Sequence, residues 1–275
     1  MARLALCTLG DLLLDVIVRL ASPLEEGTDT SAVTRTGAGG QAANVAAWAA
    51  ELGAEARFVG KRGDDPAGAL VGGELAARGV TVVGPEPAGR NGIVVSLVRP
   101  DGERAMATDR GVAPTLDADE LEPTWFDGCT HLHLSGYSVM SAPMDGAALR
   151  AAEIVRRAGG SVSVDLASVS VIRDFGVERL RARLAELAPD LVFGNEQERD
   201  LVGRPVGPAT WVVKRGAAGC AIERGGDRDE LPAAPAEVVD TTGAGDAFAA
   251  GYLVGGAELA LATAARCVGK LGAMP

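Results

Sequence analysis

The sequence is poor in aromatic residues and has no excess of positive charge. Aromatic residues make up 4% of its 275 residues, so the core must be built mainly from alanine, valine and leucine. Lysine and arginine number 26 against 37 aspartates and glutamates, and the formal net charge is −11. Proteins that bind nucleic acid usually carry a basic surface, and this composition indicates none. We therefore expect no nucleic-acid partner.

Cysteine and histidine are also scarce, and they form no recognisable metal or redox motif. The four cysteines are Cys7, Cys129, Cys220 and Cys267. They are widely spaced without a Cys-x-x-Cys pair, which is typical of buried thiols in a reduced cytoplasmic protein. His131 and His133 would share one face of a strand, but no third ligand is evident. Two partly buried histidines are therefore a better interpretation than a metal site.

Long apolar runs and the common nucleotide-binding motifs are missing as well. Asp11, Asp15 and Arg19 interrupt the apolar N-terminal region, so it resembles neither a signal peptide nor a membrane span. No Gly-x-x-x-x-Gly-Lys-Ser/Thr motif occurs, which excludes a P-loop as the source of ATP binding. A Gly-x-Gly-x-x-Ala match at 37–42 lacks the preceding apolar strand of a dinucleotide fingerprint. We expect a cytoplasmic protein with no membrane partner.

The second half of the chain alternates short apolar segments with helical ones. The expected strands are 130–135, 161–165, 190–194 and 210–214, with helices at 143–158 and 177–187 between them. Such alternation predicts a parallel sheet that is covered by helices on both faces. Two further apolar helices are expected at 244–254 and 257–268. Ligands of such sheets bind at the carboxyl ends of the strands.

The stretch from Asp240 to Phe248 combines glycines with the start of an apolar helix. Gly243 and Gly245 leave backbone N–H groups free to point at an anion, and the helix dipole favours negative charge there. Asp246 lies in the first turn, beside that anion. A carboxylate suits phosphoryl transfer, in which an aspartate accepts the proton of the attacking hydroxyl. The simpler interpretation is a helix cap, in which Asp246 only complements the dipole.

Two segments resemble the signatures of the PfkB family of sugar kinases. They are GGQAANVA at 39–46 and, about 200 residues later, DTTGAGDAFAAG at 240–251. The resemblance covers nearly the whole chain. It implies an α/β, ribokinase-like fold, which is a three-layer αβα sandwich with a central, mostly parallel sheet. It also implies one domain over 1–275, with a small β-sheet lid formed by 12–36 and 91–108.

The same resemblance implies the residues that carry the chemistry. Asp246 matches the catalytic base, and Gly243, Ala244 and Gly245 match the anion hole for the transferring phosphate. The residues implied on the acceptor side are Asp11, Gly39, Gly40 and Asn44. Their chemistry suits a polyol, because a carboxylate accepts from two vicinal hydroxyls and an amide can both donate and accept.

Metal and nucleotide positions are implied in the same way. Asn195 and Glu198 resemble a motif that supports Mg²⁺ through water, although their i, i+3 spacing fits a helix-capping box equally well. Many family members also require K⁺, and Asp240 and Thr242 are placed for it. The residues implied beside ATP are Asn195, Lys214, Gly216 and Gly219. The family often has threonine at position 214.

The acceptor is left open by the sequence. The first hypothesis is a hydroxymethyl group of a ribose- or fructose-like sugar. A nucleoside is second, because Asp165 is not followed by the residues usual in sugar kinases. A sugar acid is third and depends on Arg110, which could bind a carboxylate or phosphate. The non-enzyme alternative is a catalytically silent ligand-binding regulator, and the intact 243–246 segment disfavours it. A homodimer through the lid is plausible.

Overall fold

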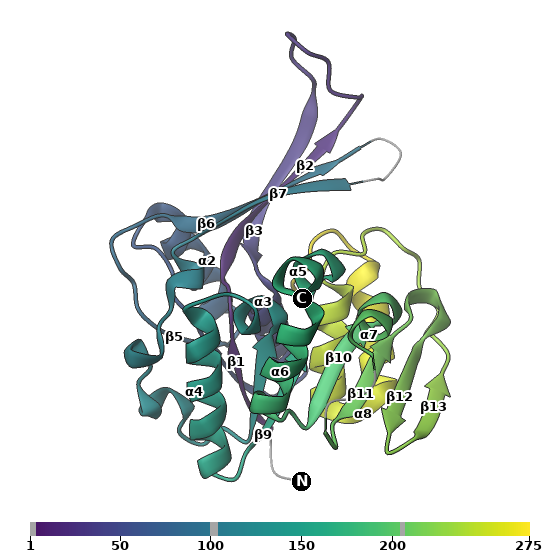
Figure 1. Cartoon of the computed structure of the whole chain (residues 1–275). Helices are drawn as coiled ribbons and strands as arrows, with labels where there is room; N and C mark the ends of the chain where they lie inside the picture. The colour runs from purple at the N-terminus through teal and green to yellow at the C-terminus, as the bar shows by residue number, and fades with distance from the viewer. Residues whose placement is uncertain (1–3, 100–103, 204–206) are drawn as a thin grey trace.

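Short runs of valine, leucine and alanine form a large sheet flanked by helices, and a smaller sheet projects from it (Figure 1). The computed structural model describes residues 4–99, 104–203 and 207–275. The strands of the large sheet are β1 (Ala5–Leu9), β4 (Glu55–Val59), β5 (Thr81–Val83), β8 (His131–Ser135), β9 (Ser161–Asp165), β10 (Leu191–Asn195), β11 (Thr210–Lys214), β12 (Cys220–Arg224) and β13 (Asp227–Leu231). The four strands expected in the second half are thus confirmed to within one residue.

The order of the large sheet is β13-β12-β11-β10-β9-β8-β1-β4-β5. From β5 to β11 all neighbours are parallel, and β12 and β13 add two antiparallel strands at one edge. The carboxyl ends of β1, β8, β9, β10 and β11 therefore open at one edge of the sheet. This is the edge at which ligand-binding residues are expected.

Helices cover both faces of the sheet. The α-helices are α1 (Gln41–Glu51), α2 (Pro66–Ala77), α3 (Gly136–Val139), α4 (Met144–Arg157), α5 (Val169–Phe175), α6 (Val177–Leu187), α7 (Glu196–Val202) and α8 (Ala244–Val268), and short 3₁₀ helices occupy Ala113–Thr115, Ala118–Glu120, Pro123–Phe126 and Gly216–Ala218. One core packs α1 and α8 against Phe58 and Phe193, and the other packs α4 and α6 against Leu132 and Trp211. The three-layer sandwich is confirmed.

Helix α8 includes both of the apolar helices expected near the C-terminus. Its backbone is not helical at Gly255 and Gly256, which is where the sequence pattern placed the break. By length and composition α8 also resembles a membrane span. In this fold, however, its N-terminal half is buried against α1 and the sheet. That burial fixes the position of the helix's first turn.

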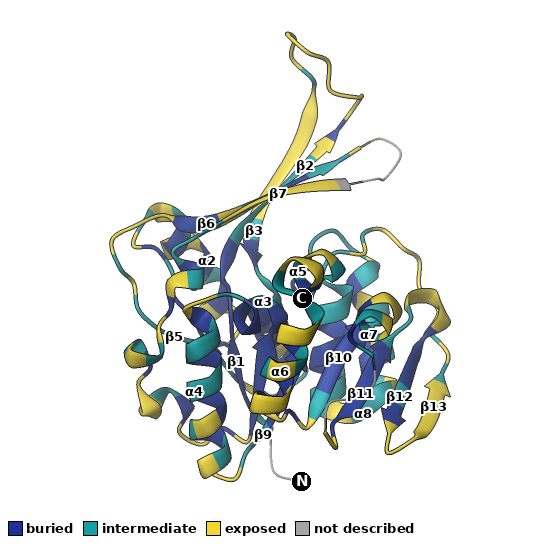
Figure 2. Cartoon of the chain, viewed as in Figure 1, coloured by how far each residue is buried: buried dark blue, intermediate teal, exposed yellow. Residues whose placement is uncertain are grey.

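The smaller sheet contains β2 (Leu13–Leu20), β3 (Ala32–Gly39), β6 (Asn91–Val98) and β7 (Arg104–Gly111), in the order β3-β2-β6-β7. The central pair β2–β6 is parallel and the outer pairs are antiparallel. Figure 2 shows that β3 is largely exposed, whereas the strands of the large sheet are mostly buried except for the edge strands β5 and β13. The expected lid segments 12–36 and 91–108 contain most of these strands, and β3 and β7 each end three residues beyond the expected limits. Between β6 and β7 the sequence Pro-Asp-Gly at 100–102 predicts a hairpin turn, and these residues lie outside the described part of the chain.

Candidate functional site

The first turn of α8 presents backbone N–H groups at the residues predicted to bind an anion. Gly243, the N-cap residue, has φ 75° and ψ 0°, a left-handed conformation that favours glycine. A Cβ atom there would lie 2.5 Å from Cβ of Ala273, so no larger residue fits without a shift. Within the described part of the chain, the N–H groups of Gly245 and Asp246 donate to no acceptor. Free N–H groups at a helix N-terminus are suited to a phosphate.

Asp246 stands beside these donors with its carboxylate held by α1. Asn44 Nδ2 donates to Asp246 Oδ2 over 2.7 Å. Burial raises the pKa of Asp246 to about 7, although the bond from Asn44 and the charge of Lys214 oppose the rise. A carboxylate with a pKa near neutrality can accept a proton from a hydroxyl group.

A cavity of about 660 Å³ lies on one side of this turn, between the small sheet and the body of the protein. It is lined by Asp246 and Gly243 from α8, by Asn44 and Gly40 near the start of α1, and by Arg110 from β7. Asn44 Oδ1 is buried and accepts no hydrogen bond from the described residues. Hydroxyl groups of a bound ligand would find both donors and acceptors on this wall.

A second cavity, of about 550 Å³, lies on the other side of the same turn. Its lining includes Lys214 and Thr241 with the glycines Gly216, Gly219 and Gly245. The remaining lining is apolar and comprises Ala217, Ala233, Ala234, Pro235, Ala236, Val238, Ala244, Phe248, Leu261, Ala264, Ala265 and Val268. The first turn of α8 therefore separates two ligand cavities. A group passed from one ligand to the other would cross at residues 243–246.

Asp11 and Arg110 are both at the first cavity, but they bind each other. Arg110 donates from Nε to Asp11 Oδ2 over 2.6 Å and from Nη2 to Asp11 Oδ1 over 2.9 Å. Its Nη1 donates to Ser141 Oγ over 3.3 Å, and its guanidinium lies 5.6 Å from the ring centre of Tyr137. The pair links the small sheet to the end of β1. The expected acceptor contacts of these residues are untested, and this pairing would compete with them.

Asp15 is a cavity residue that sequence reasoning missed. It lies on β2 and lines the cavity that contains Asp246, and it also borders a further cavity of about 680 Å³ beside residues 270–275. Burial raises its pKa to about 6. The signal in the sequence was a carboxylate inside the apolar segment Leu13–Val18, because charged side chains are rarely buried unless they have a partner.

The two predicted glycines at the start of α1 make room for the backbone of Asp11 and the side chain of Asp15. Gly40 has φ 102°, and a Cβ there would lie 2.3 Å from the backbone oxygen of Asp11. A Cβ on Gly39 would lie 2.2 Å from the carboxyl group of Asp15. Gly40 lines the cavity, whereas Gly39 acts by leaving space for Asp15.

Asn195 and Glu198 form the capping box of α7. Asn195 Oδ1 accepts from the Glu198 N–H over 2.9 Å, and Glu198 Oε2 accepts from the Asn195 N–H over 2.8 Å. The capping interpretation is therefore confirmed. Glu198 Oε1 accepts no bond from any described residue, and burial raises the pKa of this carboxyl group. One carboxylate oxygen is thus free for a hydrated cation, so the residues fit Mg²⁺.

Asp240 holds the loop that precedes α8. Its Oδ1 accepts from Thr242 N over 2.9 Å and Thr242 Oγ1 over 2.7 Å, and its Oδ2 accepts from Gly272 N over 3.0 Å. These bonds fix the approach to Gly243. They neither support nor oppose the K⁺ ion that was expected at this position.

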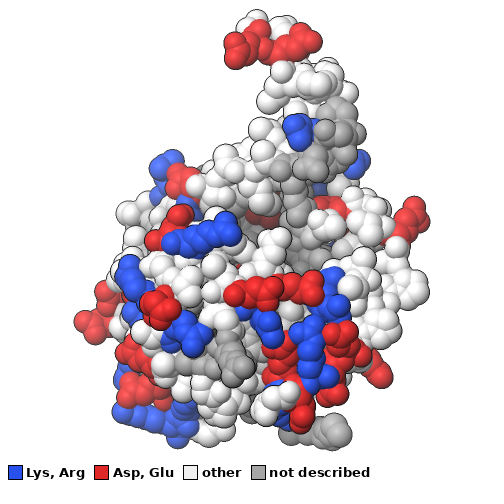
Figure 3. Space-filling model, turned by 45° about the vertical axis from the view of Figure 1, so that its right-hand side comes forward, with Lys and Arg blue, Asp and Glu red and all other residues white. Residues whose placement is uncertain are grey.

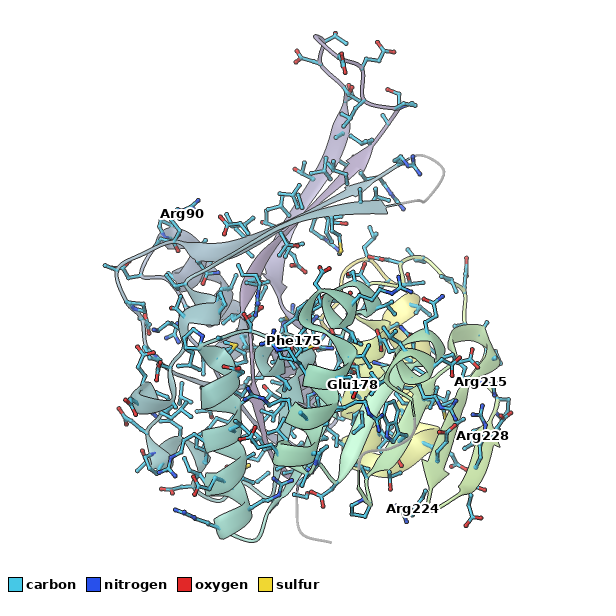
Figure 4. All side chains as sticks on the ribbon, in the orientation of Figure 1. Arg90, Phe175, Glu178, Arg215, Arg224 and Arg228 are labelled. Atoms are coloured by element: carbon cyan, nitrogen blue, oxygen red, sulfur yellow. The ribbon has the colours of Figure 1, made fainter. Side chains whose placement is uncertain are left out.

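Lys214 ends β11 and turns inward, whereas its neighbour Arg215 turns outward. Lys214 Nζ donates to Asp165 Oδ2 over 2.7 Å. Arg215, labelled in Figure 4, pairs with Glu196 at 3.1 Å and Glu230 at 2.8 Å on the surface. On the face in Figure 3, basic side chains are interspersed with acidic ones, and acidic side chains occupy the tip of the small sheet. Lys214, rather than Arg215, therefore brings a positive charge to the second cavity.

His131 and His133 are buried and bonded to serines of β9. His131 contacts Ser161 Oγ at 2.6 Å and Ser163 Oγ at 2.7 Å, and His133 contacts Ser163 Oγ at 2.8 Å. Burial lowers the pKa of both to about 3, so they are neutral at pH 7. Their observed role is structural.

Comparisons with known proteins agree with this geometry. A family model described as pfkB family carbohydrate kinase matches residues 4–274. An ATP-dependent ribose-1-phosphate kinase of Halopiger xanaduensis is 32% identical, over 92% of this chain and 86% of its own. A fructokinase of Klebsiella pneumoniae is also 32% identical, over 79% and 76%. The crystal structure of adenosine kinase from Sinorhizobium meliloti superposes with a TM-score of 0.87 at 24% identity, covering 100% of this chain and 96% of that one.

Proposed function

The chain belongs to the pfkB family of carbohydrate kinases, and on this premise we propose that it transfers the γ-phosphoryl group of MgATP to a primary hydroxyl group of a small neutral sugar, ribose- or fructose-like. One observation carries the proposal. The first turn of α8 has free N–H groups, an apolar cavity on one side and the buried carboxylate of Asp246 on the other. ATP would occupy the apolar cavity, and the sugar would occupy the cavity beside Asp246.

The residues of this turn would have different roles in the reaction. The N–H groups of 243–246 would hold the transferring phosphoryl group, where fixed dipoles stabilise its charge. Asp246 would accept the proton of the attacking hydroxyl as the new P–O bond forms. Asn44 would keep the carboxylate in place, since it already donates to Oδ2.

The charges around the acceptor favour a neutral molecule. Asp15 and Asp246 both face this cavity, and the single positive charge of Arg110 is matched by Asp11. An anionic acceptor would therefore meet a negative field. The hydroxyl groups of a sugar, by contrast, can donate to these carboxylates.

A second candidate is an acceptor that carries a phosphate or carboxylate group. Arg110 supports it, because this guanidinium lies at the cavity and could exchange Asp11 for an anion of the substrate. The resemblance to a kinase named for ribose 1-phosphate points the same way. Replacing Arg110 with leucine would abolish activity toward such acceptors and reduce activity toward neutral sugars less.

Two cations belong to the proposal. Mg²⁺ would be bound through water near Glu198 Oε1, and Asn195 would orient that carboxylate through the capping box. The ion would offset the charge of the ATP phosphates. K⁺ would lie near Asp240 and Thr242, beside the loop that sets the position of Gly243.

We also propose a cytoplasmic homodimer in which the small sheet acts as lid and interface. Exposed apolar side chains on this sheet support the interface: Val33 is 73% exposed, Met106 54% and Ile93 36%. Light scattering after gel filtration would measure the mass. A monomer at micromolar concentration would oppose the dimer without affecting the kinase assignment.

The testing experiment is a coupled assay of ADP release with MgATP. Ribose, fructose, ribose 1-phosphate, a sugar acid and adenosine would be compared, with and without K⁺. Release that depends on one acceptor and is lost in Asp246→Asn would support the proposal. Binding of an acceptor without release, in the native protein, would instead favour a silent regulator.

A further inference from the structure

The side chain of Lys214 lies against the first turn of α8. A Cβ atom built on Gly245 would lie 3.1 Å from Lys214 Nζ, so the ammonium group rests against the backbone of the first turn of α8. The lysine also lines the cavity assigned to ATP, and its side chain is only 18% exposed. The end of β11 thus delivers a positive charge to the point between the two cavities.

Two positive features meet at this point. The N-terminus of α8 carries the positive end of the helix dipole, and the N–H groups of Gly245 and Asp246 are unpaired within the described residues. In the folded protein the buried carboxylate of Asp165, 2.7 Å away, balances the charge of the Lys214 ammonium group. Among the described residues, Lys214 Nζ donates only to Asp165, although an ammonium group has three N–H bonds. Donors are therefore left for a ligand in the cavity.

Asp165 explains how this lysine is held in the folded protein. Its side chain is fully buried at the end of β9, and its Oδ2 accepts from Lys214 Nζ over 2.7 Å. It does not line the acceptor cavity. Asp165 therefore neutralises the lysine and fixes its direction, which makes it a positioning residue. This assigns a role to a carboxylate whose following residues depart from the sugar-kinase pattern.

We propose that the Lys214 ammonium group is a catalytic group of this kinase that binds the transferring phosphoryl group opposite the N–H groups of α8. The inference rests on the proposed function. The bond between the γ-phosphorus and the β–γ bridging oxygen breaks, the bond to the acceptor oxygen forms, and the acceptor proton goes to Asp246. Lys214 keeps its own protons throughout. It offsets charge on the phosphoryl oxygens.

The test compares Lys214→Met with the double variant Lys214→Met/Asp165→Asn. The single variant leaves a buried carboxylate unpaired, which destabilises the fold, whereas the double variant removes both charges. Lys61→Met is the matched control, because Lys61 is also buried and pairs with Glu120 at 2.7 Å. Lys61 lines neither ligand cavity. Turnover is measured with the acceptor found in the panel, and calorimetry gives Kd for Mg-ADP and for Mg-AMP-PNP.

Both Lys214 variants are expected to lose turnover by roughly 10²-fold, as for other transition-state donors. Their preference for AMP-PNP over ADP is expected to fall by about tenfold or more, since a charged hydrogen bond to the γ-phosphate is lost. ADP affinity should stay within about threefold of native, and Lys61→Met should match native in every assay. Lys214→Arg should recover part of the turnover, because it retains the charge.

Two results would overturn the inference. Recovery of native turnover in the double variant would mean that Lys214 only neutralises Asp165. An unchanged preference for AMP-PNP over ADP would mean that the lysine does not contact the γ-phosphate. The nucleotide measurement needs no acceptor, so it remains decisive for Lys214 even if the native protein releases no ADP with any compound.

Discussion

Replacing Asp246 with asparagine is expected to stabilise the protein at alkaline pH while removing most of its turnover. Asparagine has nearly the same shape, and its Oδ1 can still accept from Asn44. The change removes a carboxylate whose ionised form is costly in this buried position. The base for phosphoryl transfer is lost with it, and turnover should fall by roughly 10²- to 10⁴-fold.

The size of the stabilisation follows from the pKa of Asp246. It is about 7 in the folded protein, against 3.8 for the ordinary side chain. Between these two pH values the folded state retains a proton that the unfolded chain has released. The native protein therefore loses stability as pH rises from about 4 to about 7, by at most about 4 kcal/mol. The asparagine variant has no such loss.

Urea denaturation at pH 5 and pH 8 tests this reasoning. The free energy of unfolding of the variant should exceed that of the native protein by about 2–4 kcal/mol more at pH 8 than at pH 5. Asp227→Asn, at an exposed position of β13, controls for the loss of one negative charge from an acidic protein. An equal difference at both pH values would refute the assignment of a raised pKa to Asp246.

Three further predictions concern the pH dependence of the rate, the backbone at Gly243 and the choice of nucleotide donor. Because Asp246 must be ionised to act as a base, kcat/KM is expected to rise with pH through about 7, and a flat profile from pH 5.5 to 8 would contradict this. Gly243→Ala should lower Tm and turnover, because residue 243 has φ 75° and the added methyl group would meet Ala273 at 2.5 Å. Gly53→Ala, at φ 92° with open space around it, isolates the backbone cost, and an equal loss of Tm in both variants would argue against the clash. Among the described residues, the polar side chains that line the cavity proposed for ATP are those of Lys214 and Thr241. The kcat/KM for GTP should therefore be within about tenfold of that for ATP, and a preference above about 100-fold would show that the base is read by hydrogen bonds.

The local patterns of the sequence predicted the strands of the second half of the chain and the turn at the start of α8. The alternation of strand and helix patterns predicted the bounds of β8 to β11 to within one residue, because a buried strand is recognisable from its own apolar residues. Glycines before an apolar helix predicted the turn proposed to bind an anion, since that turn is built from consecutive residues. The match to a known family supplied Asn44 in addition, and its bond to Asp246 fits the resemblance.

What the tertiary structure decided is the pairing of charges that are distant in the chain. Asp11 lies 99 residues from Arg110, and Asp165 lies 49 from Lys214, yet each pair is in direct contact. Asp15 became a cavity residue only when β2 joined the small sheet over α8. No local pattern encodes these contacts, because they depend on which strands are neighbours and on where their ends meet. Residue types were thus predictable from sequence, whereas the partners and directions of the charged side chains were set by the assembled fold.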